Sequence, residues 1–203
     1  MEYCDLGSLD MHILKYKNRI LPTDFIRHII KETLNGVHYL HNKMGICHRD
    51  LKPENIMLKT NFSNINPFPL IKIGDFGISK HLTENNCIQT IIGTSFYIAP
   101  EIPLESKSSF NCDFWSLGVM YYEIKTGEHP LLRGNRELEN CWRNQSEIEY
   151  ILDEWKDDVI MMDLIKQMLI YSPEKRITWK GIKESKLYKS LFDTCDLNSS
   201  FAF

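Results

Sequence analysis

Apolar residues recur at three- and four-residue steps between Pro22 and Asn42, which is the period of an amphipathic helix. The apolar positions are Phe25, Ile26, Ile29, Ile30, Leu34, Val37 and Leu40. Pro22 and Thr23 suit the start of this helix, and Asp24 suits its positive end. The segment also carries His28, His38 and His41. We interpret all three as surface or packed histidines, because none has a convincing ligand geometry with an acid or a thiol.

Three further segments follow helical patterns. Residues 112–125 are apolar on every side, which predicts a helix inside the core. Residues 159–170 predict an amphipathic helix with Val159, Met162, Ile165, Met168 and Leu169 on its apolar face. Thr178 is expected to cap one last helix, whose inward residues are Trp179, Ile182, Leu187 and Leu191.

Two short apolar runs, 56–58 and 70–73, indicate strands. The stretch between them is rich in Asn, Pro and Phe, so we expect a hairpin connection. The fold class that these patterns predict is mainly α with a small β-hairpin region.

Composition narrows the class of protein. The 203 residues are 43% hydrophobic and 25% charged, with a formal net charge of −3, which is ordinary for a globular domain or one large lobe. The charge gives no reason to expect nucleic acid or a membrane as partner, and no apolar run reaches the ~20 residues of a membrane span. Glu2 and Asp5 stand where a signal peptide needs positive charge. Six scattered cysteines predict reduced thiols rather than a zinc or disulfide framework, so we expect an intracellular, cytoplasmic protein.

One polar loop, residues 48–55, has the sequence His-Arg-Asp-Leu-Lys-Pro-Glu-Asn. It places a carboxylate, an ammonium and a carboxamide within a few residues of one another. Asp50 can accept a proton from a hydroxyl, Lys52 can reach phosphoryl oxygens, and Asn55 can offer its carbonyl oxygen to Mg²⁺. The alternative is a charged surface loop that binds nothing.

Two later motifs add to this pattern. Gly74-Asp75-Phe76-Gly77 follows the predicted hairpin, and its carboxylate is an oxygen ligand of the kind that Mg²⁺ requires. Residues 93–101, Gly-Thr-Ser-Phe-Tyr-Ile-Ala-Pro-Glu, close a polar, non-periodic stretch. Together with the loop at 48–55, these motifs resemble those of eukaryotic-type serine/threonine protein kinases.

The resemblance covers residues 1–192 as the large C-terminal lobe of a kinase domain with its hinge, and leaves 193–203 as a tail. The order of elements is similar to that of the calcium/calmodulin-dependent group. The family implies ATP and Mg²⁺, a protein substrate, and an upstream kinase or regulator. It also implies that the backbone near Glu2 and Cys4 binds adenine, that Met57 lies under the adenine ring, and that Asp75 and Asn55 hold the metal.

The resemblance assigns further roles. Arg49 would pair with a regulatory phosphate on Thr90, an interpretation that rests on spacing, with an unmodified Thr90 as the alternative. Thr94 would lie near Asp50 and Lys52 and favour serine and threonine over tyrosine.

Three other residues have structural roles in the same resemblance. Asp113 would tie its helix to the catalytic loop. Glu101 and Arg176 would form a buried ion pair.

Some kinase motifs are not found in the sequence. No two of the ten glycines stand at G-x-G spacing, and no V-A-I-K-like segment precedes the hinge. We therefore expect the small N-terminal lobe to be absent and the chain alone to be nearly inactive.

Two alternatives remain. One is a kinase-lobe binding module that docks partners without turnover. The other is a small-molecule phosphotransferase of kinase-like fold, which residues 94–101 disfavour. A P-loop ATPase is excluded, because the sequence has no G-x-x-x-x-G-K motif.

Overall fold

The longest amphipathic segment forms α2 (Thr23–Tyr39) in the computed structural model, which describes residues 2–63, 66–75, 96–102, 109–131 and 157–192 and the backbone of 80–81. The predicted helix is confirmed, and its apolar face, from Phe25 to Val37, is buried. It continues into a π-helical turn, η2 (Leu40–Met44), which ends at Gly45 with a φ of 65°. The chain then turns directly into the polar loop.

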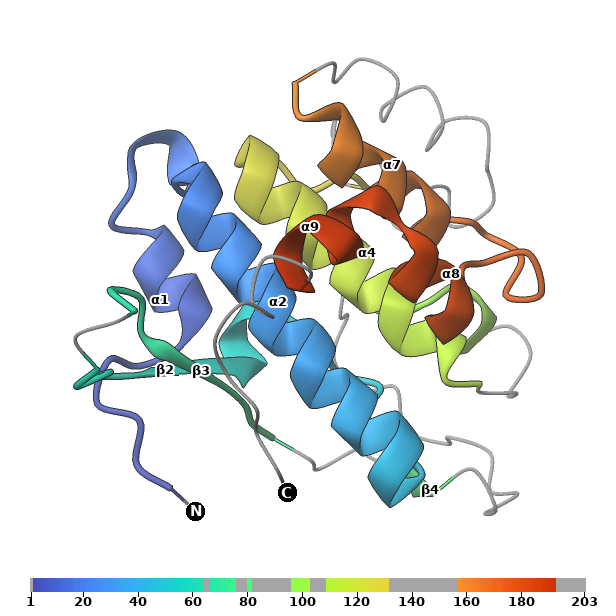
Figure 1. Cartoon of the computed structure of the whole chain (residues 1–203), viewed down its shortest axis with the longest axis horizontal. Coiled ribbons are helices and arrows are strands. Elements are labelled where there is room, and N and C mark those ends of the chain that lie inside the picture. The colour runs from blue at the N-terminus through green and yellow to red at the C-terminus, as the bar shows by residue number, and fades with distance from the viewer. Residues whose placement is uncertain are drawn as a thin grey trace.

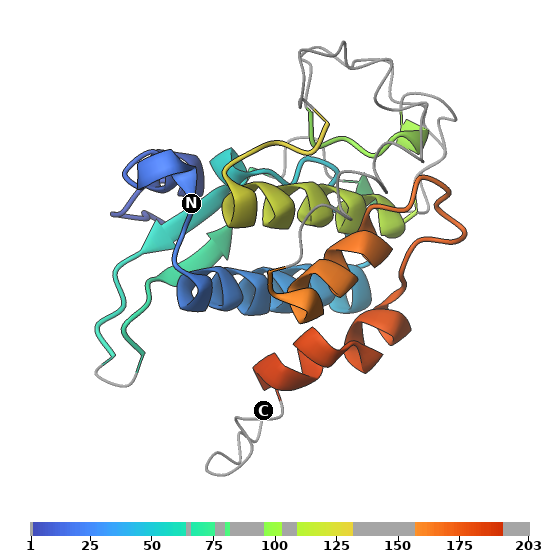
Figure 2. The same ribbon diagram turned by 90° about the horizontal axis from the view of Figure 1, so that it is seen from above.

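The second central helix is α4 (Asn111–Thr126), which lies beside α2 (Figures 1 and 2). It is buried on all sides, as its continuous apolar sequence predicts. The helix ends at Gly127, whose φ of 76° is a left-handed conformation that glycine adopts without strain. These two helices form the centre of the core.

Helix α7 (Val159–Met168) packs against α4. The approach is close at Gly118, where an added Cβ would lie 2.8 Å from Cβ of Met168. The prediction of an amphipathic helix is confirmed, but one position of its apolar face is wrong. Val159 is 72% exposed, because it is the first residue of the helix and lies at its solvent end, whereas Met161 is buried.

The last helical segment is two helices rather than the one expected, α8 (Trp179–Glu184) and α9 (Lys186–Phe192). Ser185 separates them with an extended backbone, at a ψ of 149°. The expected cap is present, because the side chain of Thr178 accepts a hydrogen bond from the backbone N–H of Gly181. Figure 2 shows both helices in red on the outer side of α2 and α7. The predicted tail, 193–203, lies outside the described residues.

β2 (Ile56–Lys59) and β3 (Leu70–Ile73) lie at one side of the helical body, and β4 (Lys80–His81) lies apart from them, near the far end of α2 (Figure 1). β2 and β3 pair antiparallel, with Ile56 opposite Ile73, which confirms the hairpin. β1 (Ile46–Cys47) pairs with β4. The fold class is therefore mainly α with a small β-hairpin region, as predicted.

Short elements complete the description. They are α1 (Leu9–Ile13) and the 3₁₀ turns η1 (Lys17–Arg19) and η3 (Pro53–Asn55). The segment before α1 runs along β2, where the N–H of Leu6 donates to the carbonyl of Leu58 and the N–H of Leu58 donates to the carbonyl of Gly7. Among the residues that the structure describes, no helix combines the length and the apolarity that crossing a bilayer requires.

Candidate active site

The polar loop lies between β1 and η3 and brings Asp50, Lys52 and Asn55 together. One carboxylate oxygen of Asp50, Oδ2, lies 2.9 Å from Nζ of Lys52 and accepts a hydrogen bond of 2.9 Å from Nδ2 of Asn55. The same Nδ2 donates to the backbone carbonyl of Asp50 at 2.7 Å. The side chain of Asp50 is only 7% exposed, whereas that of Lys52 is 25% exposed. An ammonium and a carboxamide therefore meet at one carboxylate.

The backbone conformation of the loop brings the side chains of Lys52 and Asn55 to Asp50. Arg49 has a φ of 70°, a left-handed conformation that costs a non-glycine residue free energy and that is often found at functional sites. Lys52 is extended, and Pro53 then starts the 3₁₀ turn that carries Asn55 back over Asp50. Proline suits the first position of a helical turn, because its missing N–H would have had no partner there.

His48 joins this loop to the residue before Asp75. Its Nδ1 accepts a hydrogen bond from the backbone N–H of Asp50 at 3.3 Å, so its Nε2 is the atom that donates, at 3.0 Å, to the carbonyl of Gly74. The N–H of Gly74 donates to the carbonyl of Asn55 at 2.8 Å. Asp75 is therefore attached to the same side of the molecule as Asp50 and Asn55, and it is exposed.

The oxygen atoms of this region suit a divalent cation. Both hydrogen bonds that Asn55 makes to Asp50 use its amide nitrogen, so its carbonyl oxygen remains for a metal. Asp75 follows Gly74, whose N–H donates to the carbonyl of Asn55, and adds an exposed carboxylate to this region. Oxygen ligands of these two types are what Mg²⁺ binds in proteins.

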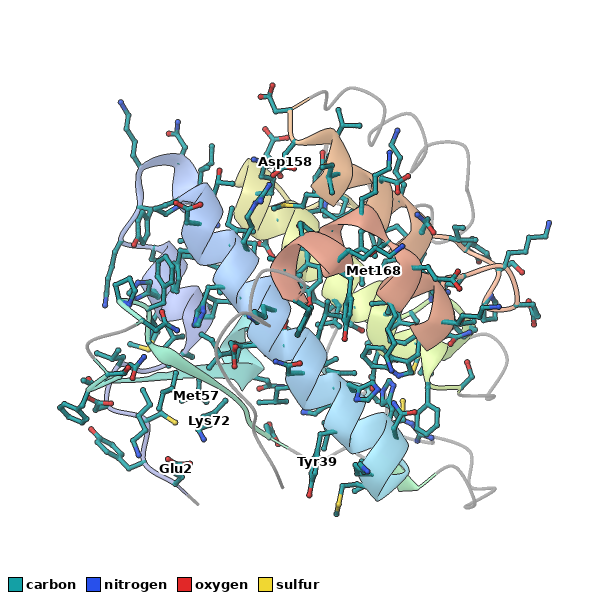
Figure 3. All side chains as sticks on the ribbon, in the orientation of Figure 1. Glu2, Tyr39, Met57, Lys72, Asp158 and Met168 are labelled. Atoms are coloured by element: carbon teal, nitrogen blue, oxygen red, sulfur yellow. The ribbon has the colours of Figure 1, made fainter. Side chains whose placement is uncertain are left out.

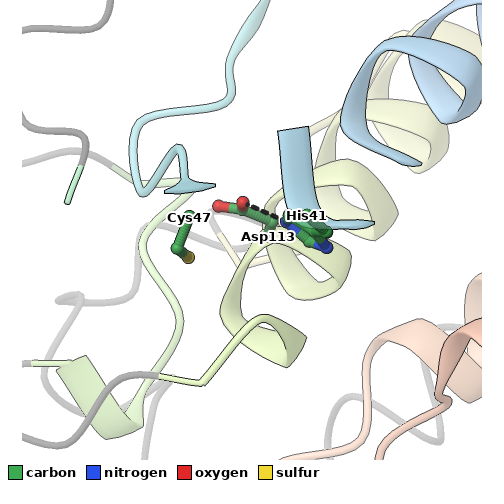
Figure 4. Close-up of side chains that lie close together, drawn as sticks. All are labelled: His41, Cys47 and Asp113. Atoms are coloured by element: carbon green, nitrogen blue, oxygen red, sulfur yellow. Dashed lines mark hydrogen bonds and ion pairs between the residues drawn. The ribbon is translucent and has the colours of Figure 1, made fainter. Parts of the chain in front are cut away.

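A second carboxylate, Asp113 on α4, holds the start of the loop from beneath. Its Oδ2 accepts hydrogen bonds from the N–H of His48 at 2.8 Å and from Nε2 of His41 at 2.7 Å, and its Oδ1 accepts from the N–H of Arg49 at 2.8 Å. Figure 4 shows His41, from η2, pointing its ring at Asp113. We call His41, Asp113 and the two backbone N–H groups the Asp113 cluster. His41 is a packed histidine, as expected, but its contact with the carboxylate of Asp113 was not predicted from the sequence.

The hydrogen bonds of the Asp113 cluster lower the pKa of its carboxyl. Burial is the largest single influence and raises the pKa, since the side chain of Asp113 is 0% exposed. The hydrogen bonds from His41 and from the backbone N–H groups of His48 and Arg49 act in the opposite direction, and the net pKa lies below the ordinary value. The carboxylate is therefore ionised and fully hydrogen-bonded.

Two buried thiols lie beside this cluster. Sγ of Cys47 is 3.2 Å from Sγ of Cys112, and both cysteines are free thiols. Their hydrogen bond and their burial raise the pKa of Cys47 well above its ordinary value. Ligand atoms of His41, Cys47 and Asp113 lie within 4.8 Å of one another, which a metal ion could bridge. Because both oxygens of Asp113 already accept hydrogen bonds, we interpret the group as a hydrogen-bonding centre.

Arg176 and Glu101 pair at the far side of α4. The guanidinium contacts both carboxylate oxygens, at 2.6 Å and 2.8 Å. The side chains are 0% and 3% exposed. The remaining donors of Arg176 bind the backbone carbonyls of Ile170, Asn111 and Tyr171.

The predicted hinge lies along the hairpin edge. Figure 3 labels Glu2, Met57 and Lys72 at this edge. The carboxylate of Glu2 contacts Nζ of Lys59 at 2.7 Å and Nζ of Lys72 at 3.5 Å, and Ser8 pairs with Met57. Met57 is half-buried, and the carbonyl of Cys4 accepts from the N–H of Gly7. The adenine contacts expected of Glu2, Cys4 and Met57 stay predictions.

Three features of the sequence predictions lie outside the described residues. They are Thr90, Thr94 and the Phe76-Gly77 half of the motif that begins with Gly74. The phosphate that Arg49 was expected to bind on Thr90 is therefore a prediction too.

Comparison with known proteins agrees with this geometry. Residues 1–188 match the family model described as "Protein kinase domain". The chain is 35% identical over 189 residues to a probable cell cycle serine/threonine-protein kinase, CDC5 homolog, of Encephalitozoon cuniculi, a match that covers 92% of this chain and 38% of that protein.

Two other relatives are similar. The probable serine/threonine-protein kinase fhkB of Dictyostelium discoideum is 37% identical over 87% of this chain and 15% of its own. Serine/threonine-protein kinase 17A of Oryctolagus cuniculus is 32% identical over 88% of this chain and 44% of its own. The chain thus spans less than half the length of each of these relatives.

The mostly helical architecture, with its small antiparallel hairpin, fits the C-terminal lobe of the kinase fold. The match to the family model extends over nearly the whole chain. This chain belongs to the protein kinase domain family, and within it to the eukaryotic serine/threonine type.

Proposed function

We propose that the chain supplies the catalytic loop and the metal-binding side of an enzyme that transfers the γ-phosphoryl group of ATP to serine or threonine hydroxyls of proteins. The observation that carries this proposal is the pairing of Asp50 with both Lys52 and Asn55 at 2.9 Å. An acid, an amine and an amide converge there in the arrangement that phosphoryl transfer to a hydroxyl needs.

Asp50 is the proposed proton acceptor. Its carboxylate would orient the attacking hydroxyl and take its proton as the new bond to phosphorus forms. The hydrogen bond from Asn55 and the strained φ of Arg49 fix the orientation of this carboxylate before substrate arrives. Positioning of this kind, rather than covalent chemistry, supplies most of the catalysis in phosphoryl transfer.

Lys52 is the proposed partner of the transferring group. Its ammonium lies beside Asp50 and is partly exposed, so it can contact a phosphate that approaches from solvent. Mg²⁺ held by Asn55 and Asp75 would neutralise charge on the nucleotide phosphates. Lys52 and Thr94 together favour serine and threonine over tyrosine as phosphoacceptors.

We further propose that the 203-residue chain turns over slowly by itself. Its sequence contains no Gly-rich phosphate loop and no V-A-I-K-like lysine, which in kinases hold the nucleotide phosphates from the opposite side. The loss of that positioning would slow transfer without removing the acid or the metal ligands.

A single-turnover assay tests the proposal. The chain, in excess over γ-labelled Mg·ATP, is incubated with peptides that differ only in carrying serine, threonine or tyrosine, and phosphate incorporation is measured by mass spectrometry. We expect slow incorporation into serine and threonine peptides, and a fall of about 10²–10⁴-fold in Asp50→Asn.

The matched control is Asp163→Asn. Among the residues that the structure describes, the side chain of this exposed aspartate on α7 bonds to Gln167, within its own helical turn, so the variant should keep the wild-type rate. Equal incorporation by wild type and Asp50→Asn would contradict the role of Asp50. Incorporation by neither protein would contradict the proposed transfer.

A further inference from the structure

Trp179 stands next to the Asp113 cluster, although it is 138 positions away from His41 in the sequence. Its indole Nε1 donates a hydrogen bond of 3.1 Å to Nδ1 of His41. The indole ring also makes an edge contact with His38, at 4.9 Å between centroids, and with Phe114, at 5.0 Å. The first residue of α8 is thereby attached to the end of α2 and to α4.

The indole hydrogen bond determines which nitrogen of His41 carries the proton. An indole N–H can only donate, so Nδ1 of His41 must accept and cannot be protonated. The proton of the neutral imidazole is then on Nε2, which donates to Oδ2 of Asp113 at 2.7 Å. In the opposite tautomer, a lone pair of His41 Nε2 would face the buried carboxylate of Asp113. The N–H groups of His41 Nδ1 and Trp179 Nε1 would also point at each other.

The tautomer matters because the side chains of the Asp113 cluster are closed off from bulk solvent. The side chains of His41 and Asp113 are both 0% exposed. The carboxylate holds the backbone N–H groups of His48 and Arg49, the two residues that precede Asp50. When a buried carboxylate loses one donor, the carboxylate rotates or its remaining hydrogen bonds weaken, since hydrogen bonds in such networks support one another.

We propose that Trp179 is a positioning residue for the catalytic loop, which acts by orienting the Nε2–H imidazole of His41 and hence the carboxylate of Asp113. Its catalytic consequence rests on the proposed function, because Asp50 is the proton acceptor only in that proposal. The tautomer and the order of the loop need no turnover, so they can be measured separately from phosphoryl transfer.

The test uses Trp179→Phe, which removes the N–H and keeps an aromatic ring. Nitrogen-15 NMR of the imidazole reports the tautomer of His41, and amide hydrogen exchange reports the order of the loop. We expect wild-type His41 to be the Nε2–H tautomer. In Trp179→Phe, where Nδ1 of His41 has lost its donor, we expect the nitrogen-15 shift of Nδ1 to change. We also expect an increase of about fivefold or more in exchange at the amides of His48 and Arg49, as the loss of one hydrogen bond implies.

His38→Phe is the matched control, because it changes a ring that contacts the same indole but takes no part in the hydrogen bonds of the Asp113 cluster. It should leave both the tautomer and the two exchange rates unchanged. His41→Gln supplies a second test, since a glutamine amide N–H can replace Nε2–H without an indole partner. Adding Trp179→Phe to His41→Gln should then change exchange at His48 and Arg49 much less than in the wild-type background.

Three results would overturn the proposal. The first is an Nδ1–H tautomer in the wild-type chain, which is informative even if Trp179→Phe fails to fold. The second is unchanged exchange at His48 and Arg49 in a folded Trp179→Phe. The third is an equal effect of Trp179→Phe with and without His41→Gln, which would show that the indole acts through packing alone.

Discussion

The guanidinium of Arg176 and the carboxylate of Glu101 form a two-point ion pair inside the protein, with N–O distances of 2.6 Å and 2.8 Å. The pair connects the segment that contains Glu101 to the loop before α8, across 75 positions of sequence. It is one of several long-range polar contacts that surround α4.

Removing one partner of this pair should destabilise the folded protein. We expect Arg176→Met to lower the free energy of unfolding by about 3–5 kcal/mol, because Glu101 would stay buried without its counter-charge. Urea denaturation followed by circular dichroism measures the change. The control is Lys59→Met, which breaks the exposed ion pair of Lys59 with Glu2 at 2.7 Å and should leave stability unchanged. Equal effects of the two substitutions would show that the buried pair contributes nothing beyond a surface contact.

Asp113→Asn should destabilise the protein in a pH-dependent way. The folded state lowers the pKa of Asp113, so its carboxylate stabilises the protein fully above the ordinary aspartate pKa, and this contribution is lost as the pH falls through the lower folded-state pKa. Urea midpoints of wild type and Asp113→Asn should therefore differ by a constant amount above about pH 5 and converge below about pH 4. A difference that grows on acidification would contradict the assigned direction of the shift.

His129, which follows the end of α4, should lower the free energy of unfolding at mildly acidic pH. Burial lowers its pKa to about 4, so the unfolded chain binds a proton between pH 6.5 and that value while the folded chain does not. The contribution of neutral His129 to the free energy of unfolding is fully present above pH 6.5. It is lost as the pH falls, by at most about 1.4 kcal/mol per pH unit. His129→Phe should reduce this loss between pH 7 and pH 5. An NMR titration that finds the wild-type imidazole titrating near pH 6.5 would refute the prediction.

Local sequence patterns were sufficient to predict the longer helices and the β2–β3 hairpin, but not β1, β4 or the division between α8 and α9. The three- and four-residue spacing on α2 and the continuous apolar run of α4 each specify burial through neighbours in sequence, so α2 and α4 could be assigned without a structure. Val159 was misassigned for the same reason, because periodicity gives the face of a helix but not which end of it projects into solvent.

Long-range partners were not predictable in this way. His41 meets Asp113 across 72 positions and Trp179 across 138, and Cys47 meets Cys112 across 65. No periodic pattern in the sequence indicates contacts between residues this far apart. The polar loop at 48–55 was predictable, because Asp50 contacts Lys52 and Asn55 within six residues and the motif is local. The pair of Glu101 with Arg176 and the contact of Asp113 with the loop were expected from the family resemblance and not from local patterns.

The central claim, that Asn55 and Asp75 hold magnesium for ATP beside Asp50, is tested most directly by thermal unfolding of the chain with ATP, in the presence of Mg²⁺ and of a chelator. We predict that millimolar Mg·ATP raises the melting temperature by a few degrees, as ligand binding to the folded state requires. ATP with the chelator should not do so, and Asp75→Asn should abolish the magnesium-dependent part while Asp163→Asn retains it. No shift with Mg·ATP, or the same shift in Asp75→Asn and in the chelator, would contradict the claim.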